Sequence, residues 1–522
     1  MEQEKKLTKH AGHIAGGTAI SRILGYLRDM LVAHTFGAGL AADAFYAAYR
    51  IPNLFRRLLG EGALSASFIP VLSEYLHTKT KEETQELLNA LYSILLIILV
   101  VITALGIFFA PYLVNIIAYG FTSNSEKMAL TVTLTQLMFP FLLFICMAAL
   151  GLGILNTLSA FFMPAVAPAS LSVAEIVFLL AIAPLLSPDN QIKGLALSVI
   201  IGGLGQYLIQ LPAIYKLGWK LQWKPNFSHP GVKKIAWLML PATIGLSVDQ
   251  INAFVDTVCA SFLHEGSITA LYYSNRIMQL PLAIFGIALA SVALPSMSKA
   301  VAKNDTADFK NTLNFAMRFN MFMLIPAATG LMVLGLPMIR VLFERGEFNH
   351  QATVLTNSAL FWYTLGLPAY AAVKVLASAF YAYQQTKTPV KVAATAIIIN
   401  VLIIGGLFFS GRRSVGVLAF ASSLASWFNV FMLGYLLRKK VGPLGISKTL
   451  VSIAKTCIAS AAMGLVSYWV AFQWLANKPI IGLFASLLIG IAVYFSIAYI
   501  FKFDESKPLF SLILDEKPTG TE

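Results

Sequence analysis

Three formal charges interrupt a stretch that is otherwise apolar enough to cross a bilayer. The stretch is GGTAISRILGYLRDMLVAHTFG, from Gly16 to Gly37, and its charged residues are Arg22, Arg28 and Asp29. A guanidinium offers a planar fork of N–H donors that grips phosphate oxygens in pairs, whereas a lysine acts as a point charge. Arginines in this setting indicate recognition of a phosphate or pyrophosphate group.

A second polar pattern follows between Ala41 and Tyr75. The residues that recur every three or four positions, and so share one helix face, are Arg50, Asn53, Arg57, Glu61 and Ser65. Arg56 lies off this face. Because the segment is too long for one apolar crossing and contains Pro52, we expect a bent helix that lines a cavity.

The cost of burying charge decides where the arginines lie. Each charged side chain at a helix centre costs about 2.5–3.5 kcal/mol on insertion scales, so it must face protein or water. The arginines concerned are Arg22, Arg28, Arg56 and Arg276. Internal ion pairs are one alternative, for instance Arg28 with Asp43 or Arg57 with Glu61. The first two helices nevertheless hold five arginines and three acids, which favours a cationic cavity for an anion.

Asp256 is a separate case, because no arginine lies within one helical turn of it. It is either satisfied by packing neighbours or binds Na⁺ or H⁺, as intramembrane acids often do, and Asn400 offers a further oxygen ligand. The histidines and cysteines show no metal-ligand spacing, and no nucleotide-binding or hydrolase motif occurs. We expect a protein that is not an enzyme, with no metal site and no cofactor, and coupling to Na⁺ or H⁺ stays open.

The elements that carry these residues are membrane-spanning helices. Of the 522 residues 58% are hydrophobic and 12% charged, with a mean hydropathy of +0.74, against about 45–50% and 25% in soluble domains. The apolar runs are continuous rather than alternating, which excludes a β-barrel. We expect an all-α polytopic protein with about fourteen spans, centred near Ile23, Leu58, Ile98, Leu142, Val173, Gly203, Val248, Leu282, Leu324, Tyr363, Ile398, Leu424, Ala461 and Ile489.

The distribution of basic residues predicts that both termini are cytoplasmic. With an even number of spans, 22 of the 38 Lys and Arg residues fall in segments on the side of the termini, where short loops retain positive charge. The basic residues assigned to the opposite loops are Lys127, Lys193, Arg340, Arg345, Arg412, Arg413 and Lys478.

An internal repeat organises the spans. Matching residues recur at shifts of 225–227: Asp29, Ala33 and Gly39 as Asp256, Ala260 and Gly266, Arg50 as Arg276, and Pro70 and Ser73 as Pro295 and Ser298. Chance similarity of apolar segments is the alternative to duplication of a six-helix unit. Because six crossings return the chain to the same side, the two units are parallel repeats. We expect lobes at 1–225 and 226–445 around a central cationic cavity, with two extra helices and a cytoplasmic tail at 446–522.

Three motifs carry a resemblance to a known family. They are SRILGYLRDMLVAHTFGAGLAADAFYAAYRIPNLFRRLLGEGALSASFIPVLSEY, LYYSNRIMQLPLAIFGIALASVALPSMSK and AFYAYQQTKTPVK. With them the chain resembles the MurJ (MviN) family of bacterial lipid II flippases, within the multidrug/oligosaccharidyl-lipid/polysaccharide exporter superfamily. The resemblance implies alternating-access transfer of an undecaprenyl-pyrophosphate-linked peptidoglycan precursor from the cytoplasmic to the periplasmic leaflet of the inner membrane.

The resemblance also implies site residues. Those matching the family's substrate-binding positions are Arg22, Arg28, Arg56, Arg276 and Asp43, and further candidates for the cavity are Asp29, Arg50, Asn53, Arg57, Glu61 and Lys374. The family's cation site maps to Asp256 and Asn400, but Ile404 supplies no oxygen, and Asn275 stands where an acid is expected beside Arg276. The last two helices would form a groove for the lipid tail. Lipid II and membrane lipids are the expected partners, and no nucleic acid is expected. Whether cell wall synthesis proteins also bind is left open by the sequence.

Four other functions compete with this interpretation. A cation-coupled drug exporter or a flippase for a related lipid-linked oligosaccharide belongs to the same superfamily. A non-transporting scaffold for cell wall synthesis would need no interior charges. A membrane enzyme acting on lipid pyrophosphates would need an acid/base or metal constellation, which the sequence does not offer.

Overall fold

A computed structural model describes residues 2–58, 64–445 and 447–506, and within these ranges every regular element is a helix. Eleven helical segments in the described chain are long and apolar enough to cross a bilayer. The protein is therefore an all-helical, multi-pass membrane protein, as its composition predicts. The eleven do not include α1 (Glu2–Phe36) or α12 (Pro230–Ser261), which are 35 and 32 residues long.

Contacts divide the chain into two units. The first comprises Met1–Ile268 and Arg345–Asn349, and the second comprises Thr269–Glu344 and His350–Glu522. Helix α12, which the repeat assigns to the second lobe, packs within the first unit, where Lys234 Nζ lies 2.6 Å from Glu74 Oε2 of α3. The predicted lobes, 1–225 and 226–445, follow the sequence repeat, whereas the two units follow the packing of helices. The lobe boundaries therefore stay a prediction.

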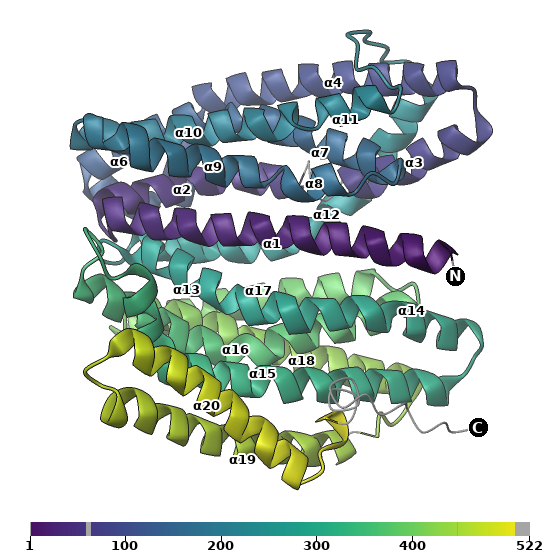
Figure 1. Ribbon diagram of the computed structural model, residues 1–522. Helices are drawn as coiled ribbons and strands as arrows, with labels where there is room; N and C mark the ends of the chain where they lie inside the picture. Colours follow the sequence, from purple (N-terminus) through teal and green to yellow (C-terminus); the bar gives the residue numbers. More distant parts are fainter. Residues whose placement is uncertain (1, 59–63, 446, 507–522) are drawn as a thin grey trace. The chain divides into compact units, whose positions relative to one another are not determined.

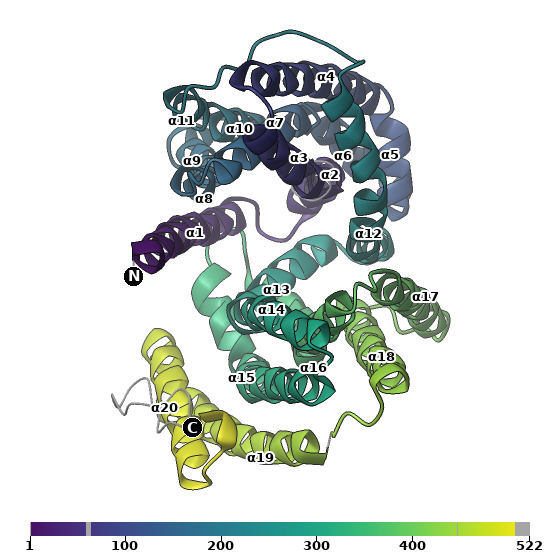
Figure 2. The ribbon, with the colours of Figure 1, turned by 90° about the vertical axis from the view of Figure 1, so that its right-hand side faces the viewer.

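The first unit is built around α7, a helix of mostly apolar and small residues. Besides α1 and α12, its helices are α2 (Leu40–Phe55), α3 (Ser65–Thr78), α4 (Lys81–Phe108), α5 (Ala110–Ile117), η2 (Tyr119–Ser123), α6 (Ser125–Met138), α7 (Phe141–Thr157), α8 (Phe162–Val166), α9 (Ala169–Val177), η3 (Phe178–Ile182), η4 (Ala183–Leu185), α10 (Pro188–Leu208) and α11 (Leu211–Lys216). Helices α3, α4 and α10 pack around α7 (Figures 1 and 2), so most of its side chains are buried.

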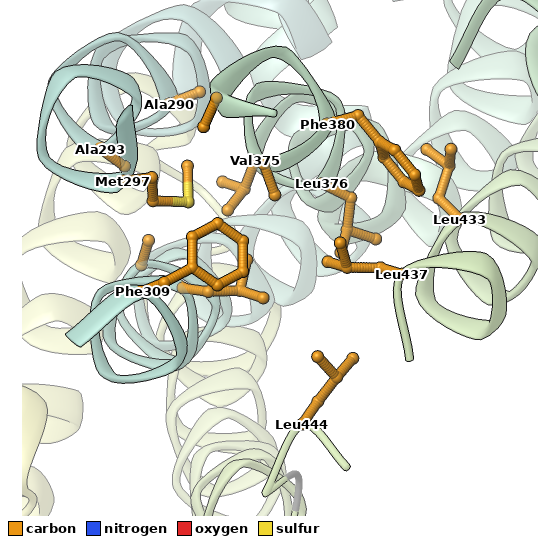
Figure 3. Packing of buried hydrophobic residues seen from close by; sticks show 14 of the residues in the cluster. Ala290, Ala293, Met297, Phe309, Val375, Leu376, Phe380, Leu433, Leu437 and Leu444 are labelled. Atoms are coloured by element: carbon orange, nitrogen blue, oxygen red, sulfur yellow. The ribbon is translucent and has the colours of Figure 1, made fainter. Parts of the chain in front are cut away.

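The second unit is built in the same way around α16. Its helices are α13 (Ser267–Pro281), η5 (Leu282–Ile287), α14 (Ala288–Ala302), α15 (Thr306–Phe343), α16 (His350–Ala382), α17 (Lys387–Phe409), α18 (Val415–Val441), α19 (Ser447–Trp469), η6 (Val470–Trp474), α20 (Pro479–Ile500) and η7 (Asp504–Ser506). Helices α14, α15 and α18 surround α16. Figure 3 shows Phe309 of α15 pointing toward Met297 of α14 and Val375 of α16 in the apolar core.

The last two long helices, α19 and α20, pack on α15. The ring of Phe322 from α15 contacts Tyr494 of α20, whose hydroxyl donates to the Phe322 carbonyl oxygen at 2.6 Å. Glu505 of η7 is buried beside this cluster, with Arg318 Nε 3.5 Å from its Oε1 and Ser452 Oγ donating to the same oxygen at 3.0 Å. These contacts hold the end of the described chain against α15 and α19.

Helix boundaries recur along the chain. The spanning segments Ser125–Thr157 and His350–Ala382, which contain α7 and α16, are both 33 residues long and begin 225 positions apart. Helices α4 and α15 also begin 225 positions apart, at Lys81 and Thr306. The central helix of each unit thus occupies the same place in a period of about 225 residues.

Helix α2 breaks where the sequence predicts a bend. It ends at Phe55, three residues after Pro52, and residues 56–58 continue in a wider π-type turn. A proline removes one backbone donor and crowds the preceding turn, which loosens a helix at this distance. A π-helical segment, η5, likewise follows Pro281 of α13.

The start of α12 yields a prediction on pH. His229 is the N-cap, with its Nδ1 accepting from the Gly231 N–H at 3.1 Å, and burial lowers the pKa of His229 below its ordinary 6.5 although the Glu86 carboxylate acts the other way. A cap formed by neutral histidine stabilises the folded protein fully at a pH above the ordinary pKa of histidine. This stabilisation is lost as the pH falls through the lower pKa that His229 has in the folded protein. We expect wild type to lose about 0.5–2 kcal/mol across that acid window.

The measurement is thermal unfolding of the detergent-solubilised protein on both sides of this pH window. The variant His229→Asn keeps a capping oxygen that does not titrate, so its stability should fall less on acidification. Equal acid sensitivity of the two proteins would contradict the prediction.

Candidate anion-binding site

Arg28 of α1 lies between two carboxylates. Its Nη2 and Nε donate to Asp29 Oδ1 at 2.6 and 3.0 Å, and its Nη1 lies 3.5 Å from Oε1 of Glu175 on α9. The side chains of Arg28, Asp29 and Glu175 are 13%, 1% and 5% exposed. Arg22, two turns earlier on α1, is exposed. The charges predicted in this helix are therefore arranged in a buried ionic cluster with an exposed arginine beside it.

Tyr49 of α2 lies near three of the predicted arginines. Its phenol lies within electrostatic range of Arg56, Arg28, Glu175 and Arg57. The Tyr49 ring stacks on Phe45 of α2 and contacts Phe141 of α7, which fixes its position. Three of the predicted cavity arginines thus share one neighbourhood within the first unit.

The break in α2 presents two of these arginines. Arg56 and Arg57 lie in the π-type turn, where Arg56 is half-buried and Arg57 is exposed. The Nε of Arg56 donates to Asn53 Oδ1 at 2.9 Å, which orients the guanidinium. Glu61, the proposed partner of Arg57, lies outside the described residues.

Arg50 reaches across to α12. Its Nε donates to Thr257 Oγ1 at 3.1 Å, next to the buried Asp256. The sequence places no arginine within one turn of Asp256 along its own helix, but the fold brings a guanidinium from α2 to that turn. The immediate environment of Asp256 therefore contains positive charge.

Asp43 of α2 forms a fully buried ion pair. Its Oδ2 accepts from Lys127 Nζ of α6 and from the Gly266 N–H, both at 2.8 Å, and the Lys127 ammonium also lies over the Phe121 ring. Gly266 has φ +84, and a Cβ there would meet the Ala38 carbonyl oxygen. Lys127, counted in the sequence analysis among the loop residues on the side opposite the termini, lies in the first turn of α6, which begins at Ser125, and its side chain is buried against Asp43. The side of the membrane on which it lies stays a prediction.

The remaining predicted residues lie in the second unit. Arg276 of α13 and Lys374 of α16 are half-buried. Asn275, which stands where an acid is expected, accepts a hydrogen bond from Gln279 Nε2 one turn later. Asn400 of α17 is buried, and its Nδ2 lies 3.4 Å from Ser422 Oγ of α18. Because Asp256 belongs to the first unit and Asn400 to the second, the predicted cation site stays a prediction.

Within the described ranges the side chains form no group of three or more His, Cys, Asp or Glu that would hold a metal ion. Sequence reasoning did not name Tyr49, Lys127 or Glu175 as site residues. One signal for Glu175 was available: an acid within an apolar span needs a cationic partner, and α1 supplies arginines. The arrangement around Tyr49 offers guanidinium donors to an anionic group.

Comparison with known proteins agrees with this chemistry. The family model described as lipid II flippase MurJ matches residues 32–488. The chain is similar to the probable lipid II flippase MurJ of Vibrio cholerae, at 36% identity over 94% of this chain and 96% of that protein. It is 37% identical to the lipid II flippase MurJ of Burkholderia cenocepacia over 74% of this chain and 76% of that protein.

Solved structures show the same fold. A lipid II flippase MurJ in an inward closed conformation superposes with a TM-score of 0.78 at 29% identity, covering 94% of this chain and 99% of that one. An inward-facing multidrug resistance MATE family transporter of the MOP superfamily gives a TM-score of 0.64 at 14% identity, covering 82% and 96%. The second similarity concerns the fold alone.

The buried pair of Asp43 and Lys127 yields a prediction on stability. Replacing Lys127 by Met leaves the Asp43 carboxylate buried without this ammonium, and removal of one partner of a buried pair costs about 3–5 kcal/mol. We expect Lys127→Met to unfold at a lower temperature or denaturant concentration than wild type. The control Lys224→Met alters an exposed side chain of the same unit and should change stability by less than about 0.5 kcal/mol.

A second variant separates charge from packing. In the Lys127→Met background, Asp43→Asn removes the unpaired charge and should recover part of the lost stability. If Lys127→Met were as stable as wild type, the pair would have no structural role.

Proposed function

The chain belongs to the MurJ family of lipid II flippases, and on that premise we propose that it moves lipid II from the cytoplasmic to the outer leaflet of the bacterial inner membrane. It is a transporter rather than an enzyme. The observation that carries the proposal is that Arg28, Arg56 and Arg57 all lie within electrostatic range of Tyr49. A pyrophosphate diester carries two negative charges and several acceptor oxygens, which suits guanidinium donors.

The proposed substrate site extends the observed cluster. In it Arg22, Arg28 and Arg56 of the first lobe and Arg276 of the second bind the pyrophosphate, with Asp43 as a supporting acid. Asp29, Arg50, Asn53, Arg57, Glu61 and Lys374 are further candidates for the cavity wall. The sugar and peptide would travel in an aqueous chamber while the polyprenyl tail stays in lipid, along a groove at α19 and α20.

The proposed architecture has fourteen spans in two six-helix lobes and two extra helices. Adding α1, α12 and the α2–α3 pair to the eleven apolar segments gives the proposed fourteen spans. The recurrence of helix boundaries at about 225 residues supports duplication of a six-helix unit. The proposed lobes at 1–225 and 226–445 then alternate in access to a cationic cavity.

The driving force in this proposal is the membrane potential. An inside-negative potential expels an anion with about 2.3 kcal/mol per charge per 100 mV. Asp256 and Asn400 remain candidates for a coupled cation, although the guanidinium of Arg50 at the neighbouring Thr257 disfavours a cation beside Asp256. Association with cell wall synthesis proteins is a further expectation from the family.

Drug export is the competing function, because a MATE transporter shares the fold. An exporter of cationic drugs needs acids that face its cavity unpaired with protein cations. In the first unit Asp29 and Glu175 lie against Arg28, and Asp43 lies against Lys127. These acids are engaged by basic side chains, which favours an anionic substrate.

Arg56 gives the cleanest test of the substrate site, because its hydrogen-bond partner Asn53 is neutral and truncation leaves no buried carboxylate at that contact. A hydrogen bond to a charged group is worth about 1.5–3 kcal/mol, so Arg56→Ala should lower lipid II translocation at subsaturating substrate by about 10–100-fold. Arg56→Lys should recover only part of the activity. The measurement is flipping of lipid II in proteoliposomes at matched protein levels.

The matched control is Arg413→Ala, which truncates an exposed arginine between α17 and α18. It should flip lipid II at the wild-type rate. Undiminished flipping by Arg56→Ala would remove Arg56 from the proposed site.

The proposed orientation, with both termini cytoplasmic, has its own test. In a variant whose three native cysteines are replaced, Lys303→Cys lies between α14 and α15 on the predicted cytoplasmic side, and Arg412→Cys lies between α17 and α18 on the opposite side. A membrane-impermeant thiol reagent applied to intact spheroplasts should label Arg412→Cys and spare Lys303→Cys. The reverse pattern would invert the topology.

A further inference from the structure

The two carboxylates at Arg28 hold it in unequal ways. Asp29 follows Arg28 directly on α1 and accepts from Nε and Nη2 at 3.0 and 2.6 Å. Glu175 comes from α9 and stands at 3.5 Å from Nη1, outside the range of a short charge-assisted hydrogen bond. Of these two carboxylates, Asp29 therefore holds the guanidinium more closely than Glu175 does.

An incoming pyrophosphate would compete with Glu175 for the Nη1 end of the guanidinium. Phosphate oxygens bind guanidinium in pairs, and the edge formed by Nε and Nη2 is already occupied by Asp29. The N–H groups on Nη1 are the ones that face Glu175. Binding of the substrate at Arg28 thus places a new anion beside the Glu175 carboxylate.

The surroundings of Glu175 offer little compensation for that second anion. The helices packed against α9 are α1 and α10. The charged residues of α1 near Glu175 are Arg28 and Asp29. The Tyr49 phenol of α2 lies within electrostatic range of Glu175, and Arg56 and Arg57 lie within the same range of Tyr49. The charged residues of α10, Asp189 and Lys193, lie within its first turns. A carboxylate buried to 5% exposure and displaced from its guanidinium is strongly disfavoured in its ionised form.

We propose that Glu175 is a positioning residue that orients Arg28 in the empty site and takes up one proton when pyrophosphate binds there. The step converts the Glu175 carboxylate and a proton from water into a neutral carboxylic acid, and the proton returns to water when the substrate leaves. Lipid II affinity therefore rises as the pH falls. This inference rests on the proposed function, because it assigns a proton to the same anion site.

The test counts protons during binding. Purified full-length protein in detergent is titrated with lipid II by calorimetry at one pH in two non-phosphate buffers of different ionisation enthalpy. Lipid II is a suitable probe because both ends of its pyrophosphate are esterified, so the probe itself does not titrate near neutral pH. Wild type should take up close to one proton, with an affinity that rises by up to tenfold per pH unit of acidification.

The variant Glu175→Gln keeps the shape of the side chain and removes the titratable group. It should bind lipid II without proton uptake and with an affinity independent of pH. The control Glu74→Gln alters an exposed carboxylate paired with Lys234 and should keep the wild-type proton count.

The outcomes separate this inference from the proposed function. Binding of lipid II by wild type without proton uptake would overturn the role of Glu175 and leave the flippase assignment intact. Proton uptake that persists in Glu175→Gln would assign the proton to another group and equally overturn it. If wild type failed to bind lipid II at all, the proposed function itself would fail.

Discussion

The requirement that every buried charge finds a counter-charge or water organises this molecule. In hydrocarbon an unpaired ion is expensive, so helices that carry charges must meet. Arg28 joins α1 to α9 through Glu175, Lys127 joins α6 to α2 through Asp43, and in the second unit Arg318 joins α15 to η7 through Glu505. Because lipid gives apolar helix faces little reason to prefer protein over lipid, such polar contacts contribute to which helices become neighbours.

The sequence predicts the helices well, because span length and apolarity are local properties. The last two predicted spans, near Ala461 and Ile489, correspond to α19 and α20, and the predicted bend of the second helix is the break three residues after Pro52. The predicted polar face from Arg50 to Ser65 assumes one continuous helix. The wider turn at residues 56–58 interrupts that helix. Arg56, predicted to lie off the face, bonds with Asn53, a member of the face three positions earlier.

Pairing partners were beyond sequence reasoning, because they depend on which helices pack together. Lys127 follows a loop and precedes an apolar run, which is typical of an exposed basic residue. Its side chain is nevertheless buried, because it pairs with Asp43, 84 positions earlier. Asp256 looks isolated in α12 until the fold brings Arg50 to the adjacent Thr257. In both cases the residue type indicated that a charged partner was needed, but the distance along the sequence did not indicate which residue it was. The partner lies on a helix that is separated from the first by several membrane crossings or by one repeat.

Burial and geometry together distinguish charge pairs that stabilise the fold from those that can exchange partners. Asp43 and Lys127 are 1% and 5% exposed, meet at 2.8 Å and share the oxygen with a backbone N–H, so an incoming ligand would have to break a closed arrangement. Arg28 is more exposed, at 13%, and its contact with Glu175 is long, so one end of the guanidinium can change partner while Asp29 keeps the other in place. A transporter needs both kinds of pair: permanent ones to define its helix packing, and exchangeable ones to bind and then release an anion. On this argument Arg28 can exchange partners during binding, whereas Lys127 holds α6 against α2 through Asp43.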